Sequence, residues 1–403
     1  MRSPGRLPGL LANLALSLAS LVVFVALAEG TARLVDLRPR SGGALANPAW
    51  LGERWLVPRK DYRERLADAG FLSRYYELFQ WDRFLFYRLR PERRLDMIDP
   101  LAPGAAEGRA NWTVETNAEG FRGAEFAPSP AAGRHRIVSL GDSSTFGWGV
   151  PADEAYPARL REALAREIGW PEERVEVLNL GVPGYSSFQG QVLLQRTGLA
   201  LHPEAVTWGF GANDGAFTGE SDRLAYERRR GWSGALLAAL HTSRAFEAFE
   251  AWFDVAAARL ARTSVEPKSE RNVASYAETA RNAAEAVAAA RAAGVPLVLV
   301  AQCMRGPAAA TLAEVARETG TPFLDATALL DEAVPGLANG AAYAELRARA
   351  AARYGESTLA ASPYLLAFLP DGCHPNAWGH EAIAEALARK LAPVLRRDAA
   401  SAR

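Results

Sequence analysis

The sequence contains little cysteine: Cys303 and Cys373 are the only two among 403 residues. Two cysteines are too few to build a disulfide scaffold. The sequence also lacks an excess of either charge, since 46 Lys and Arg balance 46 Asp and Glu, and it has no long basic run. We therefore do not expect nucleic acid as a partner. A hydrophobic content of 49% is ordinary for a globular protein, and the length allows one large domain with an appendage, or two domains.

Ionisable side chains are absent from residues 7–28. This segment is about as long as a helix that crosses the hydrocarbon core of a membrane. Arg2 and Arg6 precede it, which favours a cytoplasmic N-terminus. Arginines also follow it, at Arg33, Arg38 and Arg40, so charge alone does not fix the orientation.

Three interpretations of this segment compete. We favour an uncleaved membrane anchor, because the apolar stretch is long for a signal peptide and continues into residues 33–36 without a clear break. The second is cleavage after Ala28, since Ala26-Leu-Ala28 resembles a signal-peptidase site. Both place the remaining chain outside the cytoplasm. The third is a buried helix of a soluble protein.

Residues 30–133 follow as an accessory region rich in arginine and aromatic residues. The spacing predicts a helix around residues 62–90, and residues 112–116 alternate like a short strand. We expect the aromatic residues to pack, with a membrane-surface or ligand role as the alternative. They are Trp50, Trp55, Tyr75, Tyr76, Phe79, Trp81, Phe84, Phe86 and Tyr87.

From about Arg134 apolar strands alternate with helices. We predict strands at 137–140, 175–180, 205–210, 296–301 and 322–325. We predict helices at 155–168, 188–198, 273–293, 308–319 and 377–396. This alternation indicates a mostly parallel five-stranded sheet covered on both faces, which is a three-layer α/β/α sandwich. The chain would then divide into a membrane anchor or signal segment (1–29), the accessory region (30–133) and this domain (134–397).

Two stretches interrupt the alternation, residues 215–268 and 333–369. We predict that both are helical insertions. Both leave the carboxyl edge of the sheet. They would therefore either cover a pocket as lids or pack with no role in substrate choice.

Three short stretches after predicted strands carry groups suited to acyl transfer. They are Gly141-Asp-Ser143, Asn179-Leu-Gly-Val-Pro-Gly184 and Gly211-Ala-Asn213. The carboxyl ends of parallel strands form one edge of a sheet, where ligands collect. Ser143 would be the nucleophile. The backbone N–H groups of Ser143 and Gly184 and the amide of Asn213 would bind the oxyanion.

One histidine has an acid at a suggestive spacing. Asp371 and His374 are three residues apart and can face the same side of a tight turn. The carboxylate would hold one ring nitrogen protonated while the other addresses Ser143. The remaining histidines form no metal-ligand spacing, so we expect no metal or cofactor, and we expect His380 to be structural.

Together these residues make the chain resemble the SGNH (GDSL-type) hydrolase family, whose four blocks carry Ser, Gly, Asn and His. The blocks match in order at Ser143, Gly184, Asn213 and Asp371-x-x-His374, over about residues 134–397. The resemblance implies a flavodoxin-like fold and ester hydrolysis through an acyl-serine intermediate without a metal. It also implies that Asp142 stabilises the turn rather than acting as a catalyst.

The front half of the chain extends the resemblance. The apolar segment and Asn117-Ala-Glu-Gly-Phe-Arg-Gly123 are similar to bacterial membrane-anchored members of the family. This similarity implies an inner-membrane anchor with the catalytic domain in the periplasm, or a secreted enzyme if the segment is cleaved.

The sequence therefore predicts an extracytoplasmic serine esterase acting on a small-molecule, glycan or lipid ester, with Ser143, His374 and Asp371 as its catalytic residues. One alternative is an O-acyltransferase that moves acetyl groups onto cell-envelope glycans. A second is a non-catalytic envelope binding or scaffold protein.

The two cysteines are predicted to lie near this site. Cys303 ends the fourth predicted strand, and Cys373 lies between Asp371 and His374. In an oxidising periplasm a disulfide could pin the His374 loop. Two buried free thiols are the alternative.

Overall fold

A parallel five-stranded sheet forms the centre of the protein. The computed structural model describes residues 7–35, 77–97, 112–214, 221–250 and 274–401. Its strands are β5 (His135–Gly141), β6 (Val175–Gly181), β7 (Ala205–Gly209), β8 (Leu297–Ala301) and β9 (Phe323–Asp325). They pair in the order β6-β5-β7-β8-β9, and every pairing is parallel. This is the flavodoxin-like order, so the predicted fold class is confirmed.

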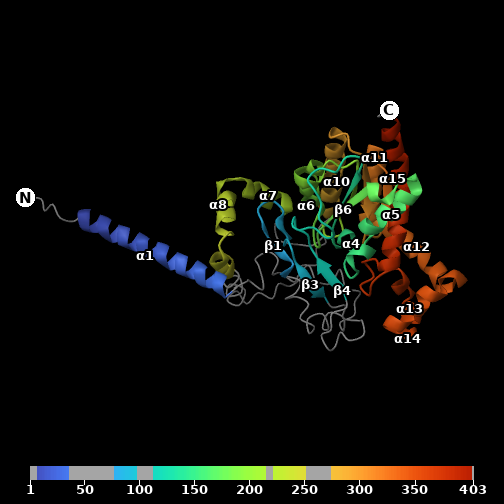
Figure 1. Cartoon of the computed structure of the whole chain (residues 1–403), viewed down its shortest axis with the longest axis horizontal. Helices are drawn as coiled ribbons and strands as arrows, with labels where there is room; N and C mark the ends of the chain where they lie inside the picture. The colour runs from blue at the N-terminus through green and yellow to red at the C-terminus, as the bar shows by residue number, and fades with distance from the viewer. Residues whose placement is uncertain (1–6, 36–76, 98–111, 215–220, 251–273, 402–403) are drawn as a thin grey trace, which may run out of the picture.

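Helices cover both faces of the sheet (Figure 1). One face packs against α5 (Tyr156–Ile168), α12 (Ala326–Asn339) and α15 (Ala377–Ser401), and the other against α6 (Ser187–Leu193), α10 (Ala274–Ala292) and α11 (Pro307–Thr319). Successive side chains of a strand point to opposite faces. In β8, Leu297 and Leu299 accordingly enter one apolar core, whereas Val298 and Val300 enter the other.

Local sequence signals start and end these helices. Ser186 and Gln189 form a capping box at the start of α6. The Asp325 side chain accepts a hydrogen bond from the third residue of α12. Helix α11 begins at Pro307 and is capped after Thr319 by Gly320, whose φ of 66° is the left-handed conformation typical of a helix end.

The accessory region contains strands where we predicted a helix. Strands β1 (Phe79–Asp82) and β2 (Phe86–Leu89) form an antiparallel hairpin, so the predicted helix is wrong for residues 79–89, and residues 62–76 lie outside the described residues. Asp82 Oδ1 accepts the N–H groups of Phe84 and Leu85, both at 2.8 Å, and this local turn competes with helix formation. Strands β3 (Arg94–Met97) and β4 (Trp112–Glu115) form a second antiparallel pair, and β4 confirms the predicted short strand.

Aromatic residues of the hairpin pack, as expected. The ring of Phe79 lies edge-on to that of Tyr87 at 5.2 Å, and Trp81 stacks on His241 at 4.3 Å. Phe79 also belongs to the same apolar core as Phe188 of α6. Trp50, Trp55, Tyr75 and Tyr76 lie outside the described residues.

The two insertions are helical where the structure describes them. The first contains α7 (Asp222–Arg230), α8 (Trp232–Leu240) and helical residues 244–250. The second contains η7 (Ala341–Tyr343), α13 (Ala344–Tyr354), α14 (Glu356–Ala361) and η8 (Pro363–Leu366). Residues 215–220 and 251–268 lie outside the described residues. Short helices elsewhere are α4 (Ser143–Phe146), η3 (Ala152–Glu154), η4 (Glu172–Arg174), η5 (Leu194–Gly198) and η6 (Leu199–Leu201).

Helix α1 (Leu7–Leu34) extends away from the rest of the molecule (Figure 1). Within its segment Leu11–Leu34, the 18-residue window that meets the membrane-span criterion has a mean hydropathy of 2.3 and is 0% buried. The interpretation as a buried helix of a soluble protein is therefore wrong. By length and composition the helix could cross a membrane, and a signal sequence has the same properties.

Candidate active site

Ser143 begins helix α4 immediately after strand β5. Asp142 precedes the helix as its N-cap, and its Oδ1 accepts the N–H of Ser144 at 2.9 Å. This agrees with the turn-stabilising role that the resemblance implied for Asp142. A Cβ atom at Gly141 would lie 1.8 Å from Thr145 Oγ1, so only glycine allows the turn to fold back this closely.

A buried hydroxyl network holds this turn against the sheet. Thr145 Oγ1 donates to Gln302 Oε1 at 3.1 Å and lies 3.2 Å from the hydroxyl of Tyr156. The Tyr156 hydroxyl in turn lies 3.2 Å from Thr207 Oγ1. Sequence reasoning missed this network, because its members come from four separate parts of the chain and only Thr145 lies in a recognisable block.

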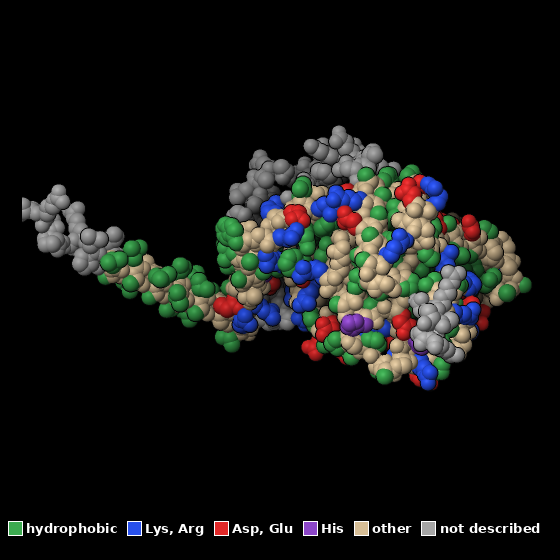
Figure 2. Space-filling view, turned by 90° about the horizontal axis from the view of Figure 1, so that it is seen from above, with side chains coloured by type: hydrophobic (Ala, Val, Ile, Leu, Met, Phe, Trp, Pro, Cys, Tyr) green, Lys and Arg blue, Asp and Glu red, His purple; other side chains and the backbone are tan. Residues whose placement is uncertain are grey.

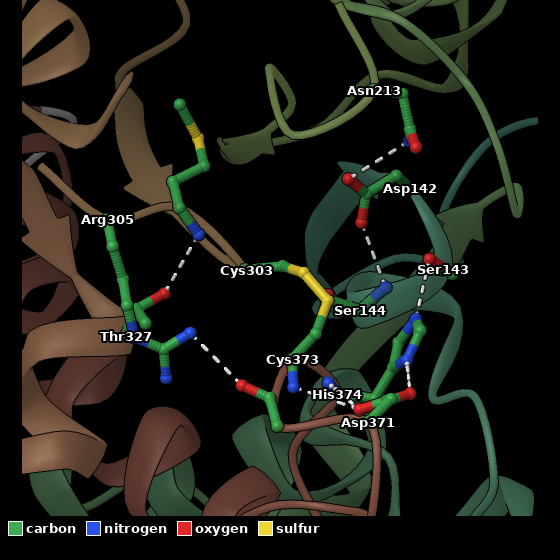
Figure 3. Close-up of a disulfide and its surroundings, with 12 residues drawn as sticks. Asp142, Ser143, Ser144, Asn213, Cys303, Arg305, Thr327, Asp371, Cys373 and His374 are labelled. Carbon is green, nitrogen blue, oxygen red and sulfur yellow. Dashed lines mark hydrogen bonds and ion pairs between the residues drawn. A yellow bond between two sulfur atoms is a disulfide. The ribbon is translucent and has the colours of Figure 1, made fainter. Parts of the chain in front are cut away.

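His374 links Ser143 to Asp371 (Figure 3). His374 Nε2 lies 2.8 Å from Ser143 Oγ, and His374 Nδ1 lies 2.5 Å from Asp371 Oδ2. Asp371 Oδ1 also accepts the N–H groups of Cys373 and His374, both at 2.9 Å, so the carboxylate shapes its own loop. All three side chains are buried. The arrangement allows a proton to pass from the serine hydroxyl to an imidazole whose tautomer is fixed by a carboxylate.

The loop that carries Asp371 and His374 is tied to the end of strand β8. Cys303 and Cys373 form a disulfide with a Cα–Cα distance of 4.7 Å, in place of the alternative of two free thiols. Beside it, Arg305 Nη1 donates to the carbonyl of Gly372 at 3.0 Å (Figure 3). The loop therefore has both a covalent and a hydrogen-bonded attachment to the sheet.

Gly184 lies in the turn after β6, with a φ of 82°. The accessory hairpin holds both neighbours of this glycine. Tyr87 Oη donates to the carbonyl of Pro183 at 3.1 Å, and Tyr185 Oη donates to the carbonyl of Tyr87 at 2.5 Å. Burial raises the pKa of both tyrosines, which keeps their hydroxyls protonated as donors.

Asn213 connects the three turns that follow β5, β6 and β7. Its Nδ2 donates to the carbonyl of Tyr185 at 2.9 Å and lies 3.4 Å from Asp142 Oδ2. Burial raises the pKa of Asp142 to about 7, and nearby His374 opposes this change. Within the described part of the chain, the backbone N–H groups of Ser143 and Gly184 donate no hydrogen bond. Both donors are thus available to a ligand.

The neighbouring Asp214 fixes the turn after β7. Its Oδ1 accepts the N–H of Ser187 at 2.7 Å, and its Oδ2 accepts the hydroxyls of Ser187 and Thr279. Burial raises the pKa of Asp214, while these hydrogen bonds oppose the change. Asp214 thus joins the Asn213 turn to helices α6 and α10.

Arg122 is a buried residue of the site that sequence reasoning missed. Its guanidinium donates to the carbonyls of Phe146 and Val150, at 2.7 and 2.5 Å, and to that of Gly147. It therefore binds the carbonyl end of the Ser143 helix, where a cation is favourable. Burial lowers the pKa of Arg122 to about 9, which leaves it charged at neutral pH. The stretch from Asn117 to Gly123 was visible in the sequence, but nothing there indicated what the arginine binds.

A cavity of about 760 Å³ lies between strands β3 and β4 of the accessory region and η3. It is lined by Asp96, Trp112, Thr113, Glu115, Pro151, Ala152 and Asp153. Trp112 packs on Trp148, whose ring lies 6.1 Å from that of His374. Among the described residues, no group of three or more His, Cys, Asp or Glu side chains is placed to hold a metal ion.

Solved structures to which the chain is similar include TesA, a lipase/acylhydrolase from Enterococcus faecalis and the acetylxylan esterase Axe2 from Geobacillus stearothermophilus. TesA is 17% identical, with a TM-score of 0.38, and the match covers 64% of this chain and 99% of TesA. The E. faecalis protein is 15% identical, with a TM-score of 0.34 and coverage of 64% and 96%. The esterase is 15% identical, with a TM-score of 0.37 and coverage of 64% and 94%. No curated protein matches the sequence.

Residues 139–382, more than half of the chain, match the GDSL-like lipase/acylhydrolase family. The match begins in strand β5 and ends in helix α15, so it spans the sheet and all four blocks. The chain therefore belongs to the GDSL-like lipase/acylhydrolase family.

Proposed function

We propose that this protein is a serine esterase that hydrolyses acyl or acetyl esters outside the cytoplasm. The observation that carries the proposal is the hydrogen-bonded chain from Ser143 through His374 to Asp371. Serine is a weak nucleophile until a base removes its proton, and this chain supplies an oriented base. Membership of a family of lipases and acylhydrolases supports the same chemistry.

The first half of the reaction forms an acyl-serine. Ser143 Oγ attacks the ester carbonyl carbon while its proton moves to His374 Nε2. Asp371 holds the opposite ring nitrogen protonated and stabilises the imidazolium. When the tetrahedral intermediate collapses, the carbon–oxygen bond to the alcohol breaks, and His374 gives its proton to the departing alkoxide.

The second half returns the free enzyme. Water attacks the acyl-serine as His374 takes one of its protons. The carboxylic acid then leaves, and His374 returns the proton to Ser143 Oγ. In both tetrahedral intermediates the negative oxygen would be bound by the N–H groups of Ser143 and Gly184 and the amide of Asn213. The Asn213 side chain would have to rotate, so that an amide N–H that now donates to the Tyr185 carbonyl points toward that oxygen.

The proposed location follows from helix α1. Its length and apolar composition suit an uncleaved anchor, with the catalytic domain on the periplasmic side of a bacterial inner membrane. An anchored esterase would act on ester groups of the cell envelope, in glycans or lipids. If the segment is cleaved after Ala28, the same enzyme would be secreted.

Replacement of Ser143 by alanine tests the proposed chemistry. We expect Ser143→Ala to lower turnover of a p-nitrophenyl acetate-type ester by at least about 10³-fold, because no other group can form the acyl intermediate. The circular dichroism spectrum should be unchanged. The free energy of unfolding should change by less than about 1 kcal/mol, since the side chain is small. An active-site phosphonate should label the wild-type protein at Ser143 only. Unchanged turnover in the variant would exclude Ser143 as the nucleophile. Absence of both turnover and labelling in the wild type would favour a binding or scaffold protein.

A further inference from the structure

Helix α8 turns an apolar face toward solvent. Trp232 is 81% exposed, Leu236 53% and Leu240 39%, and Ala235 and Ala239 lie on the same side of the helix. Surface helices of globular proteins normally place polar residues on the exposed side. A contiguous exposed apolar face marks a site that is covered by a partner or a membrane.

The carboxyl end of α8 meets helix α1. Glu29 of α1 accepts hydrogen bonds from Ser243 Oγ at 2.7 Å and from the N–H of Ala245 at 3.0 Å. Arg33 Nη2 donates to the carbonyl of Thr242 at 3.3 Å. The residues directly after α8 are therefore attached to the base of α1.

These contacts define the depth of the carboxyl end of α8 relative to a membrane that α1 would span. Glu29 is the first ionisable residue after the apolar stretch 7–28, so the hydrocarbon boundary would lie close to it. Because residues 242–245 bind Glu29 and Arg33, the end of α8 lies at the same level. This level is the interface between acyl chains and head groups.

The orientation of α8 relative to α1 suits a position at this interface. In Figure 1, α8 runs across the direction of α1, at the end of the body from which α1 leaves. Figure 2 shows hydrophobic side chains gathered at this end of the body. A helix with this orientation would lie along the bilayer surface and would not enter its centre.

The residues flanking the apolar face also suit a lipid surface. Tryptophan is enriched at membrane interfaces, and Trp232 is the most exposed large side chain of α8. Arg230, paired with Glu227, precedes α8 with 61% of its side chain exposed, and Arg33 of α1, paired with Glu29, is 60% exposed. Both cations would lie near the phosphate groups of the lipids.

We propose that α8 lies in the interface of the membrane that α1 spans, with Trp232, Leu236 and Leu240 in contact with lipid acyl chains. The inference rests on the membrane anchor of the proposed function. A single spanning helix leaves a domain free to tilt over the bilayer. A second attachment through α8 holds one face of the catalytic domain against the lipid.

Fluorescence quenching in reconstituted vesicles tests this arrangement on the full chain. Because Cys303 and Cys373 are joined, a single introduced cysteine can be labelled with an environment-sensitive nitrobenzoxadiazole dye. The label is placed at Leu236→Cys in α8, at Leu18→Cys in α1 as the anchor control, and at Arg349→Cys in α13 as the solvent control. Leu236 and Leu18 are exposed, as is the Arg349 side chain at 72%, so all three variants should fold. Each variant must retain wild-type hydrolysis of a soluble ester.

The vesicles contain phosphatidylcholine and phosphatidylglycerol, with or without phosphatidylcholine that carries a nitroxide on carbon 5 of its acyl chain. We expect the nitroxide to quench the Leu236→Cys label at least about twofold more than the Arg349→Cys label, as for a residue in the interface. Quenching at Leu18→Cys but not at Leu236→Cys would overturn the inference and leave the anchor standing. Lack of quenching at both would overturn the anchor and the inference together.

Two further outcomes distinguish other arrangements. Quenching at Leu236→Cys without quenching at Leu18→Cys would support lipid contact by α8 and overturn the spanning anchor. Oxidative cross-linking of unlabelled Leu236→Cys into dimers, without lipid quenching, would show that a second copy of the chain covers α8 and would overturn lipid contact.

Discussion

His374 Nε2 lies 2.8 Å from Ser143 Oγ, although 231 residues separate the two along the chain. The two side chains meet because β5 delivers Ser143 to the carboxyl edge of the sheet and the loop before α15 brings His374 to the same place. The position of the imidazole depends on Asp371, on the disulfide and on the packing of α15. Each of these contacts leads to a prediction.

Asp371→Asn should abolish most of the activity while preserving the fold. Asparagine keeps an oxygen that can accept the N–H groups of Cys373 and His374, but its amide would face His374 Nδ1 with a donor. The ring would then present a protonated Nε2 to Ser143 and could not act as a base. We expect kcat to fall by about 10³–10⁴-fold, measured with a soluble ester. A fall of less than tenfold, with unfolding unchanged, would show that Asp371 does not set the tautomer.

Arg122→Met should destabilise the protein and lower kcat. The change leaves the carbonyls of Phe146, Gly147 and Val150 without their buried donor, which we expect to cost about 2–4 kcal/mol in the free energy of unfolding. Arg122→Lys should recover only part of the loss, because an ammonium cannot reproduce the guanidinium fork. Urea unfolding and steady-state kinetics provide the measurements.

A matched control for Arg122 is available nearby. Arg94 is paired with Glu115 on the surface of the same region, and 71% of its side chain is exposed. Arg94→Met should change stability by less than about 1 kcal/mol. Equal stability of the Arg122→Met and Arg94→Met proteins would contradict the role assigned to Arg122.

Removal of the disulfide should loosen the loop that carries His374. The cysteines are 70 residues apart, and we expect the double variant Cys303→Ala/Cys373→Ala to lose about 2–4 kcal/mol of unfolding free energy. Its kcat should fall more than its KM rises, since the loop positions a base rather than binding substrate. Reductant should lower the unfolding free energy and the kcat of the wild-type protein, but it should change neither in the double variant. Two free thiols in wild-type protein denatured without reductant would disprove the bond.

His380 should make the protein sensitive to acid. It is fully buried in α15, as expected of a structural histidine, and its Nδ1 accepts the N–H of Tyr156 at 3.2 Å. Burial lowers its pKa from 6.5 to about 3, helped by the nearby charges of Arg122 and His374. Between these pH values the unfolded chain binds a proton that the folded protein cannot. The free energy of unfolding should therefore fall as the pH decreases, by about 1.4 kcal/mol per pH unit.

His380→Asn tests this assignment, because the asparagine oxygen can replace Nδ1 as the acceptor without titrating. The variant should lose stability more slowly than the wild type between pH 6.5 and 4 in urea unfolding experiments. His202→Asn, at an exposed position, is the control and should follow the wild-type curve. Parallel curves for the wild type and His380→Asn would show that another group causes acid sensitivity.

The predicted sheet matches the observed one because its strands and helices can be recognised from residues adjacent in the sequence. Each central strand is a short apolar run bounded by turn residues, and several connecting helices have their own start or stop signals. The helix predicted over residues 79–89 is wrong, since the hairpin formed there depends on the turn made by Asp82 and on packing against α6. Tertiary contacts of this kind outweigh the weak helical spacing of the segment.

The sequence by itself determined the parallel sheet, the order of the four blocks and the apolar N-terminal helix, because strand length, turn chemistry and hydrophobic runs are properties of adjacent residues. Only the tertiary structure decided that Arg122 binds the Ser143 helix, that Cys303 bonds to Cys373 beside His374, and that the residues after α8 bind the base of α1. These pairs come from distant parts of the chain, and a side chain can be assigned a partner only after the backbone has brought the two together.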